Sequence, residues 1–182
     1  MNLFFLDIDP KKCAEYHCDK HVVKMILEIV QMLYTSHHIL GPKEKLPEDC
    51  YKPVSVKHPT AIWIRTSEKN YLYAIEVAMS LAKEYTYRYL KTHSCEKHVV
   101  WLSNNLPQFG AVQEYSNKVT LSTNKYFQNI GITQVPLAMP AECMVKDTIQ
   151  SYRKYYFKKR LFVKWTNRPV PYWFSFINVF TL

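Results

Sequence analysis

Residues 9–38, DPKKCAEYHCDKHVVKMILEIVQMLYTSHH, carry the strongest helical pattern of this chain. Asp9 is a favourable N-cap, and Pro10 suits the first helical position, where the missing N–H would have no partner in any case. Gly41, followed by proline, is a typical stop. We therefore predict one helix over residues 11–38, entered through a capped turn.

The segment 22–33 of this helix is apolar almost all round, which is typical of a helix at the centre of a domain. Its polar exceptions are three and four residues apart, so they share one line that continues toward the N-terminus: His17, His21, Lys24, Glu28 and Gln31. Because an unpaired buried charge costs several kcal/mol, this line must face a partner, a cleft or solvent. Two interpretations stay open: a solvated edge with a Lys24–Glu28 ion pair, or an active-site wall in which Glu28 is an acid/base group tuned by Lys24 and His21.

Helical periodicity returns in three later segments. Residues 59–92 predict a second helix, unbroken or broken near Ser67, and residues 95–104 predict a third. Residues 147–165 are again helical, with many aromatic and basic side chains. The fold class that follows is mainly α, a compact helical bundle.

Four segments lack this periodicity. Residues 3–8 are a short apolar strand or extended arm, residues 42–59 a proline-rich loop, and residues 106–140 an irregular excursion with several Pro and Gly. Residues 166–182 are an extended tail of proline and aromatic residues, too apolar to be free, so we expect it to pack on the domain. We expect one domain over residues 1–182.

The composition is that of a folded globular chain. Of 182 residues, 48% are hydrophobic and only 3 are glycine, and a chain of this length can bury a core without disulfides. The odd count of five cysteines, without a paired framework, suits reduced thiols.

The location expected for the chain is intracellular. The longest apolar stretches fall short of the roughly 20 residues that a membrane span needs, so we expect no membrane partner. The N-terminus has no basic region before its apolar run, and Asp7 and Asp9 follow at once, so it is unlike a secretory signal. The expected compartment is the bacterial cytoplasm or, for a viral protein, the host cytoplasm, the host nucleus or the virion.

A formal charge of +9, from 24 basic and 15 acidic residues, favours a polyanionic partner, and double-stranded DNA is our expectation. Basic groups bind phosphates and aromatic rings stack on extruded bases. The candidate DNA-binding residues are Lys20, His58, Arg65, Arg153, Lys154, Lys158 and Arg168, and the candidate base-stacking residues are Tyr155, Tyr156 and Trp173. In the plainer alternative, the basic residues are the solvated face of a helix and the opposite face is ordinary core, formed by Tyr155, Phe157, Phe162 and Trp165.

Two segments carry a family resemblance. Asp19-Lys20-His21, followed by six residues and Glu28, resembles the Asp-x-His-x6-Glu run near the N-terminus of phage pyrimidine-dimer DNA glycosylases of the endonuclease V type. Residues 57–65, KHPTAIWIR, are similar to a His-Pro segment and downstream Arg of shorter bacterial members. The opening MNLFFLDIDP also looks like that of phage and giant-virus proteins, and the resemblance covers mainly residues 1–92, with a looser echo at residues 152–156.

This resemblance implies a compact helical domain and a DNA-repair reaction that excises a base. An amine attacks the deoxyribose C1′ to form an imine, and elimination then nicks the strand. An α-amine, with a pKa of about 7.7–8.0, is partly unprotonated at neutral pH. Because Asn2 is too bulky for efficient removal of the initiator methionine, the amine is expected on Met1. If the terminus is buried or acetylated, the amine is expected on Lys24, with its pKa lowered by a mostly apolar setting and nearby imidazoles.

The implied roles are completed by a carboxylate and by groups that orient the substrate. Glu28 would stabilise the cationic sugar and move protons, and His21, His58 and Arg65 would orient substrate or phosphate. The catalytic set is thus Glu28, Met1, Lys24 and His21, with no cofactor and no metal.

Three alternatives stay open. The first is a non-catalytic, basic nucleic-acid-binding protein, such as a viral packaging or chromatin-like component, and the second is a metal-dependent nuclease that uses Asp7, Asp9 and Asp19. The third is zinc binding by residues that recur every four positions, although their spacing matches no usual zinc motif: Cys13, His17 and His21.

Overall fold

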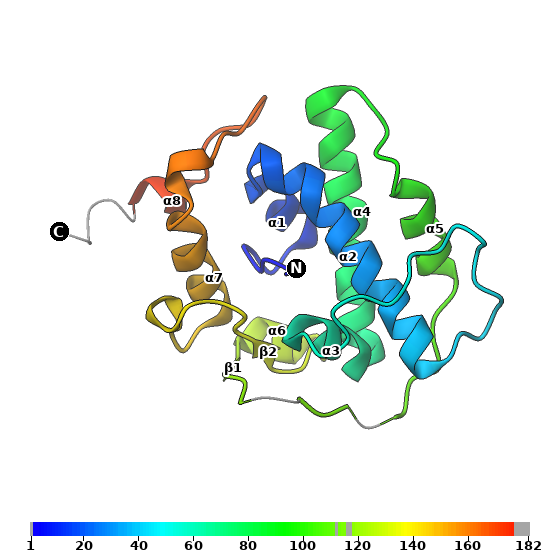
Figure 1. Cartoon of the computed structure of the whole chain (residues 1–182). Helices are drawn as coiled ribbons and strands as arrows, with labels where there is room; N and C mark the ends of the chain where they lie inside the picture. The colour runs from blue at the N-terminus through cyan, green and yellow to red at the C-terminus, as the bar shows by residue number, and fades with distance from the viewer. Residues whose placement is uncertain (1, 112, 116–117, 177–182) are drawn as a thin grey trace.

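The computed structural model describes residues 2–111, 113–115 and 118–176, with the backbone alone at Phe162 and Phe176 (Figure 1). Its elements, in chain order, are α1 (Pro10–Tyr16), α2 (Asp19–Leu40), α3 (Pro59–Thr66), α4 (Glu68–Tyr89), α5 (Glu96–Asn104), β1 (Leu121–Ser122), α6 (Lys125–Asn129), β2 (Val135–Pro136), η1 (Ala141–Cys143), α7 (Thr148–Phe157), η2 (Arg160–Phe162) and α8 (Tyr172–Phe176). The prediction of a mainly helical, compact fold is confirmed.

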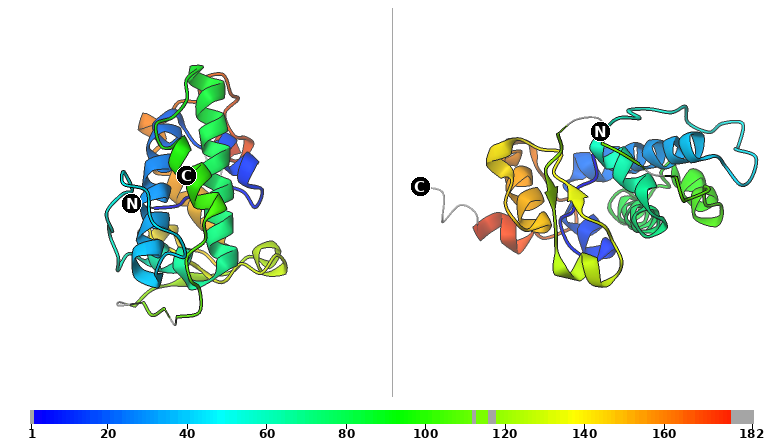
Figure 2. Two further views of the ribbon diagram at one scale, coloured as in Figure 1. Left: turned by 90° about the vertical axis from the view of Figure 1, so that its right-hand side faces the viewer. Right: turned by 90° about the horizontal axis from the view of Figure 1, so that it is seen from below.

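The helices α2 and α4 form the centre of the molecule. They pack along each other. α3 contacts both of them, α1 packs against α4, and α5 packs mainly against α4 (Figures 1 and 2). On the opposite side of α2 stand α7 and α8 (Figure 1). No described helix combines the length and the hydropathy that a membrane crossing requires.

An N-terminal arm, residues 2–8, runs through the middle of this arrangement without regular secondary structure. Its apolar side chains are fully or almost fully buried: Leu3, Phe4, Phe5 and Leu6. Phe5 stacks on Tyr73 of α4, with ring centroids 5.6 Å apart, and meets the edge of Trp63 of α3. β1 pairs with β2, and the arm joins neither strand. Of the two predictions for residues 3–8, an extended arm or a short strand, the extended arm is therefore the one observed.

The single helix predicted over residues 11–38 is wrong, because the chain breaks between α1 and α2. His17 and Cys18 are extended, with ψ of 135° and 163°. The Cys18 N–H donates to the hydroxyl of Tyr156 at 2.6 Å, and the Asp19 N–H donates to the carbonyl of Lys164 at 2.8 Å. Partners from the far end of the chain thus take amides that a continuous helix would have bonded internally.

Most other predicted boundaries are confirmed. Asp9 caps α1 by accepting a hydrogen bond from the Lys11 N–H, and Gly41 ends α2 with a positive φ of 89°. The second helix is the broken form, since Ser67 has extended backbone and its hydroxyl accepts from the Asn70 N–H. In the excursion 106–140, the two short strands and α6 are the regular structure that periodicity did not indicate.

The C-terminal quarter differs from the prediction in two places. The helix expected over residues 147–165 is shorter, because α7 ends at Phe157 and a short 3-10 turn follows. The tail expected to be extended contains the helix α8. Within the described part of the tail, Trp173 is buried, with its ring centroid 6.1 Å from that of Tyr156, whereas Val170 and Tyr172 are exposed. Residues 177–182 lie outside the described part of the chain.

Candidate active site around Glu28

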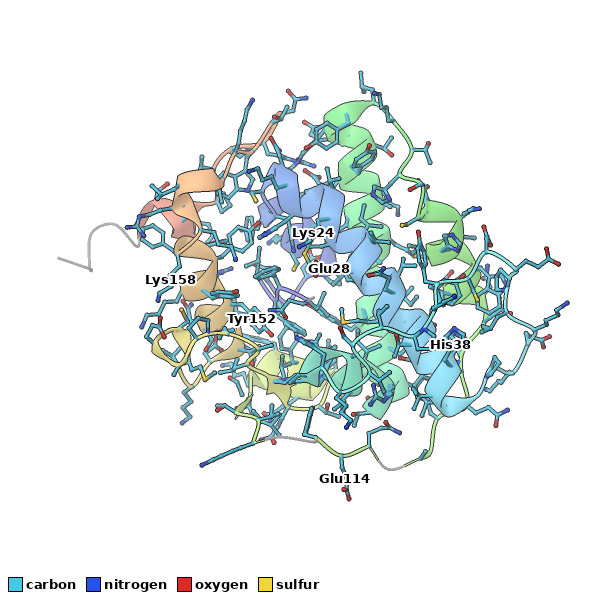
Figure 3. The ribbon with its side chains drawn as sticks, viewed as in Figure 1. Lys24, Glu28, His38, Glu114, Tyr152 and Lys158 are labelled. Carbon is cyan, nitrogen blue, oxygen red and sulfur yellow. The ribbon has the colours of Figure 1, made fainter. Side chains whose placement is uncertain are left out.

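Glu28 is buried on α2 and holds the start of the N-terminal arm. Its Oε2 accepts a hydrogen bond from the backbone N–H of Asn2 at 2.8 Å, and its Oε1 lies 3.0 Å from Nζ of Lys24. Both side chains lie on the side of α2 that faces α7 (Figure 3). The Lys24–Glu28 ion pair considered from the helical spacing is therefore observed, whereas no sequence pattern predicted the contact of Glu28 with the N-terminal arm.

Asn2 fixes the arm to two further elements. Its side-chain amide donates to the carbonyl of Ala138 at 3.0 Å, and its Oδ1 accepts from the hydroxyl of Thr60 at 3.3 Å. The first described residue is thus tied to α2, to the start of α3 and to the segment before η1. Asn2 was considered in the sequence only for removal of the initiator methionine, and the anchoring role of Asn2 was not predicted. The one feature of the sequence that points to this role is that Asn2 directly follows Met1.

His21 lies two turns before Glu28 on the same face of α2. Its Nδ1 is 3.0 Å from the hydroxyl of Tyr156, and its ring stacks on Phe4 with centroids 4.8 Å apart and planes 19° apart. Burial, reinforced by the positive charge of Lys159, lowers the pKa of His21 to about 4. The imidazole is therefore uncharged at neutral pH.

His58 approaches the site from the start of α3. Its Nδ1 accepts a hydrogen bond from the Thr60 N–H, so the side chain caps this helix. Burial lowers the pKa of His58, and the negative charge of Glu28 opposes that shift. The resemblance placed His58 near the substrate, and the structure places it within electrostatic reach of the carboxylate.

One face of α7 completes the surroundings. Tyr155 is half-buried and stacks on Phe4, with ring centroids 5.8 Å apart, and Nζ of Lys159 lies 4.7 Å from the centroid of the Tyr155 ring. An aromatic surface with a cation over it thus adjoins His21. Of the three candidate stacking residues, Tyr155 is partly exposed, whereas Tyr156 and Trp173 are buried.

Several candidate DNA contacts lie elsewhere. Arg153 is buried: its Nε donates to the Leu6 carbonyl at 2.8 Å, and its guanidinium pairs with Asp7. Arg65 is also buried and donates to the side-chain oxygen of Gln113. Neither placement supports the predicted contact with DNA, which stays a prediction for both residues.

The remaining candidates are surface residues with different neighbours. Lys20 is exposed on α2, and Lys154 is exposed on α7. Lys158 pairs with Glu142 on the outer side of α7, away from Glu28 (Figure 3). Arg168 makes two hydrogen bonds to the carboxylate of Glu84, at 3.0 and 2.8 Å.

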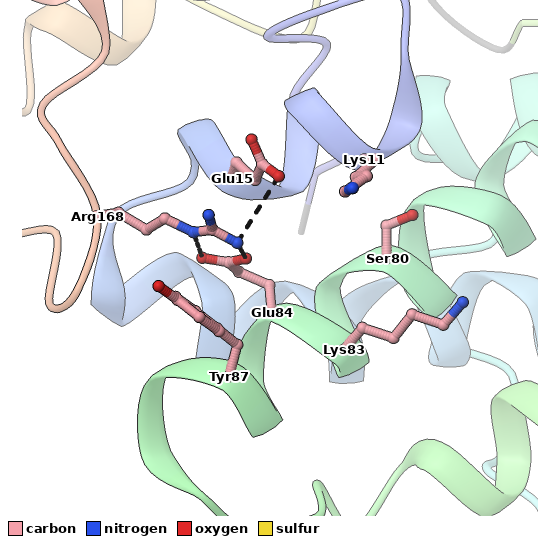
Figure 4. Close-up of a pocket in the computed structure, with 7 residues that line it drawn as sticks. All are labelled: Lys11, Glu15, Ser80, Lys83, Glu84, Tyr87 and Arg168. Atoms are coloured by element: carbon pink, nitrogen blue, oxygen red, sulfur yellow. Dashed lines mark hydrogen bonds and ion pairs between the residues drawn. The ribbon is translucent and has the colours of Figure 1, made fainter.

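Arg168 belongs to a separate pocket of about 380 Å³ between α1 and α4 (Figure 4). The pocket is lined by Lys11, Glu15, Ser80, Lys83, Glu84, Tyr87 and Arg168. The guanidinium spans Glu84 and Glu15 and lies over the ring of Tyr87. Carboxylates already compensate this cation, so the arrangement is that of a structural ion-pair network.

The setting expected for Lys24 is wrong. Its side chain is 67% exposed, so solvent surrounds the amine instead of apolar neighbours. Met1, the other amine predicted from the resemblance, lies outside the described residues.

The residues considered for the two metal-based alternatives make hydrogen bonds and ion pairs with different partners. The Cys13 thiol donates to the Phe4 carbonyl at 3.1 Å, and His17 is bonded to the Cys13 carbonyl. Asp7 pairs with Arg153, Asp9 caps α1 and Asp19 pairs with Arg88. Within the described ranges, no group of three metal-ligating side chains is arranged to hold an ion.

Comparisons with protein-family models, with curated proteins and with solved structures find no match to this chain.

The buried histidines predict an acid-sensitive fold. Burial lowers the pKa of His17 to about 3 and that of His21 to about 4, whereas an unfolded histidine titrates near 6.5. Between these values the unfolded chain binds more protons, so the free energy of unfolding falls as pH decreases below about 6.5. Urea unfolding at a series of pH values should show this fall, and His21→Gln should make it shallower. A free energy that is constant between pH 6.5 and pH 5 would contradict the prediction.

Proposed function

We propose that this chain is a DNA glycosylase with lyase activity toward a damaged or modified pyrimidine, with Glu28 as its catalytic carboxylate. The observation that carries the proposal is the 2.8 Å hydrogen bond from the Asn2 N–H to Glu28. Met1 is bonded to that same nitrogen, so an α-amine on Met1 is only a few covalent bonds from an atom in contact with the carboxylate. The resemblance of residues 19–28 to the phage glycosylase run supports the same assignment.

The proposed reaction needs an amine beside a carboxylate. The amine nitrogen bonds to C1′ of the deoxyribose as the glycosidic bond breaks, and the base leaves with the electron pair and takes up a proton. Transfer of a proton from that nitrogen to the ring oxygen breaks the C1′–O4′ bond and opens the sugar to an iminium ion, and removal of a proton from C2′ then breaks the C3′–O bond and expels the 3′ phosphate. Glu28 stabilises the cationic sugar and carries protons between these steps.

Two groups can supply the amine. A Met1 α-amine has the lower intrinsic pKa, since α-amines titrate near about 7.7–8.0 and lysine side chains near about 10.4. Lys24 is the second candidate because its nitrogen lies 3.0 Å from Glu28. Its exposure favours Met1 as the nucleophile and Lys24 as a contact to DNA phosphate.

Borohydride trapping tests the proposal. The full chain is incubated with duplexes that contain a thymine dimer, an abasic site or a modified pyrimidine, and borohydride reduces any imine to a stable adduct. We expect a covalent adduct whose peptide, mapped by mass spectrometry, contains Met1. An adduct on Lys24 would reassign the nucleophile. Tight DNA binding with no adduct and no released base on any of these substrates would overturn the proposal in favour of a non-catalytic DNA-binding protein.

The proposed DNA contacts near Glu28 are electrostatic and should show in the salt dependence. Lys20 is exposed on α2, and Lys159 lies beside Tyr155. Each phosphate contact contributes about one unit to the slope of log K against log salt. We expect Lys20→Gln and Lys159→Gln each to weaken duplex binding several-fold at low salt and to reduce the slope by about one.

Lys83→Gln is the matched control, because Lys83 is exposed on α4 at the separate pocket of Figure 4. It removes the same charge and should leave the slope unchanged. Equal losses in all three variants, measured by fluorescence anisotropy, would mean that net charge and not this surface governs binding.

A further inference from the structure

A short chain of hydrogen bonds ends at His21. The Cys18 N–H donates to the phenol oxygen of Tyr156 at 2.6 Å, and the same oxygen lies 3.0 Å from Nδ1 of His21. A backbone amide can only donate, so the phenol oxygen is the acceptor in the first bond. Tyr156 is completely buried, so its own O–H also needs an acceptor inside the protein.

Within the part of the chain that the structure describes, the acceptor with good geometry is Nδ1 of His21. The Cys18 thiol is also close to the phenol, but sulfur is the weaker acceptor. If Nδ1 accepts this proton, it carries none of its own. Since burial keeps the ring uncharged at neutral pH, the single imidazole proton is then on Nε2.

The neighbouring His17 has the opposite tautomer. Its Nδ1 lies 2.7 Å from the carbonyl oxygen of Cys13, and a carbonyl can only accept, so the proton is on Nδ1. Two histidines one turn apart are thus held in different protonation patterns by different partners. In catalytic sites, the hydrogen bond made by one ring nitrogen of a histidine likewise determines whether the other nitrogen carries the proton.

The ring of His21 is also fixed in direction. Phe4 stacks on one face, and the Tyr156 ring meets it at 69° with centroids 5.1 Å apart. Because Nδ1 and Nε2 are on opposite edges of an imidazole, Nε2 points away from Tyr156. None of the described residues forms a hydrogen bond with this atom, and it is not among the buried polar atoms that lack a partner.

We infer that Tyr156 is a positioning residue that holds His21 as a neutral Nε2–H donor, directed at an oxygen acceptor of the nucleotide bound at Glu28. The identity of the ligand rests on the proposed function, whereas the tautomer of His21 does not depend on it. A neutral donor can bind a pyrimidine carbonyl or a phosphate oxygen without adding charge beside Lys24 and Lys159. The buried Tyr156, which was predicted to stack on a base, thus acts through His21 and does not contact the substrate.

The tautomer is tested first, on the free protein. Long-range nitrogen–proton correlation spectra at pH 7 distinguish a protonated ring nitrogen from an unprotonated one. We expect His21 to be protonated on Nε2, His17 on Nδ1, and the Tyr156→Phe variant to show a mixture of tautomers at His21 alone. Protonation of His21 on Nδ1 in the unaltered protein would overturn the inference, whatever the activity.

A pair of variants tests the donor role without touching Tyr156. A glutamine side chain places its amide donor where Nε2 lies, and an asparagine places it where Nδ1 lies. We expect His21→Gln to keep most of the kcat of base excision and His21→Asn to lose at least about tenfold, with both variants folded by circular dichroism. Equal losses would overturn the donor role.

Two altered substrates identify the acceptor. A single neutral methylphosphonate, or a pyrimidine that lacks a ring carbonyl, removes one kind of oxygen at a time. The altered substrate on which His21→Gln and His21→Asn have the same kcat identifies the acceptor oxygen. If the two variants still differ on both altered substrates, the acceptor is not a nucleotide oxygen. If the unaltered protein processes no duplex, the proposed function fails, and the spectra still decide the tautomer.

Discussion

Replacing Glu28 by glutamine should lower the rate of base excision by about 10²–10⁴-fold, the usual contribution of a positioned acid/base group. Glutamine has nearly the same shape, and its side-chain oxygen can still accept the Asn2 N–H, so the arm should stay in place. What it loses is the negative charge and the ability to carry a proton. Single-turnover kinetics on the substrate identified by trapping would measure the effect, with duplex binding changed by no more than a few-fold.

Glu76→Gln is the control for this variant, because Glu76 is exposed on α4 and the substitution removes the same charge. It should leave the excision rate unchanged. A Glu28→Gln protein that retains half of the original rate would show that the carboxylate only anchors the arm, and would leave the proposed chemistry without its central group.

Arg88→Ala should lower the free energy of unfolding by about 3–5 kcal/mol, as expected when one partner of a buried ion pair is removed. The Arg88 side chain is completely buried. It donates to Glu84 at 2.7 Å, to Asp19 at 2.9 Å and to the Glu15 carbonyl at 3.0 Å, so it ties α4 to both α1 and α2. Its removal leaves carboxylates of low exposure without their main counter-ion.

Urea denaturation at pH 7 measures this change. Lys97→Ala is the comparison, since Lys97 pairs with Asp49 on the surface and exposed pairs contribute little. No measurable change is expected there. An Arg88→Ala protein as stable as Lys97→Ala would mean that Arg168, which also holds Glu84, suffices for the network.

Local patterns predicted much of the helical framework. The apolar run of residues 22–33 placed α2 at the centre, Asp9 and Gly41 marked its approach and its end, and Ser67 marked the break between α3 and α4. These features depend on neighbours within a few residues, which a sequence displays directly. The polar line through Lys24 and Glu28 was likewise a matter of helical spacing.

Contacts between distant segments could not be predicted in this way. The break before α2 depends on a hydrogen bond between residues 138 positions apart, and the burial of Arg153 depends on a carbonyl 147 positions away. A basic residue among aromatic ones looks the same in a sequence whether it faces DNA or a buried carboxylate. The roles of Asn2 and Tyr156 were hidden for the same reason, since their partners lie in other elements.

The arm has a consequence for the chain as it emerges from the ribosome. Residues 2–6 are synthesised long before the groups that enclose them, which include Ala138 and α7. A nascent chain can form α2 and α4 early, but the surroundings of Glu28 remain unfinished until α7 has left the exit tunnel. Translation products that end before α7 therefore carry the carboxylate without these surroundings, and the proposed activity should appear only after α7 has been made.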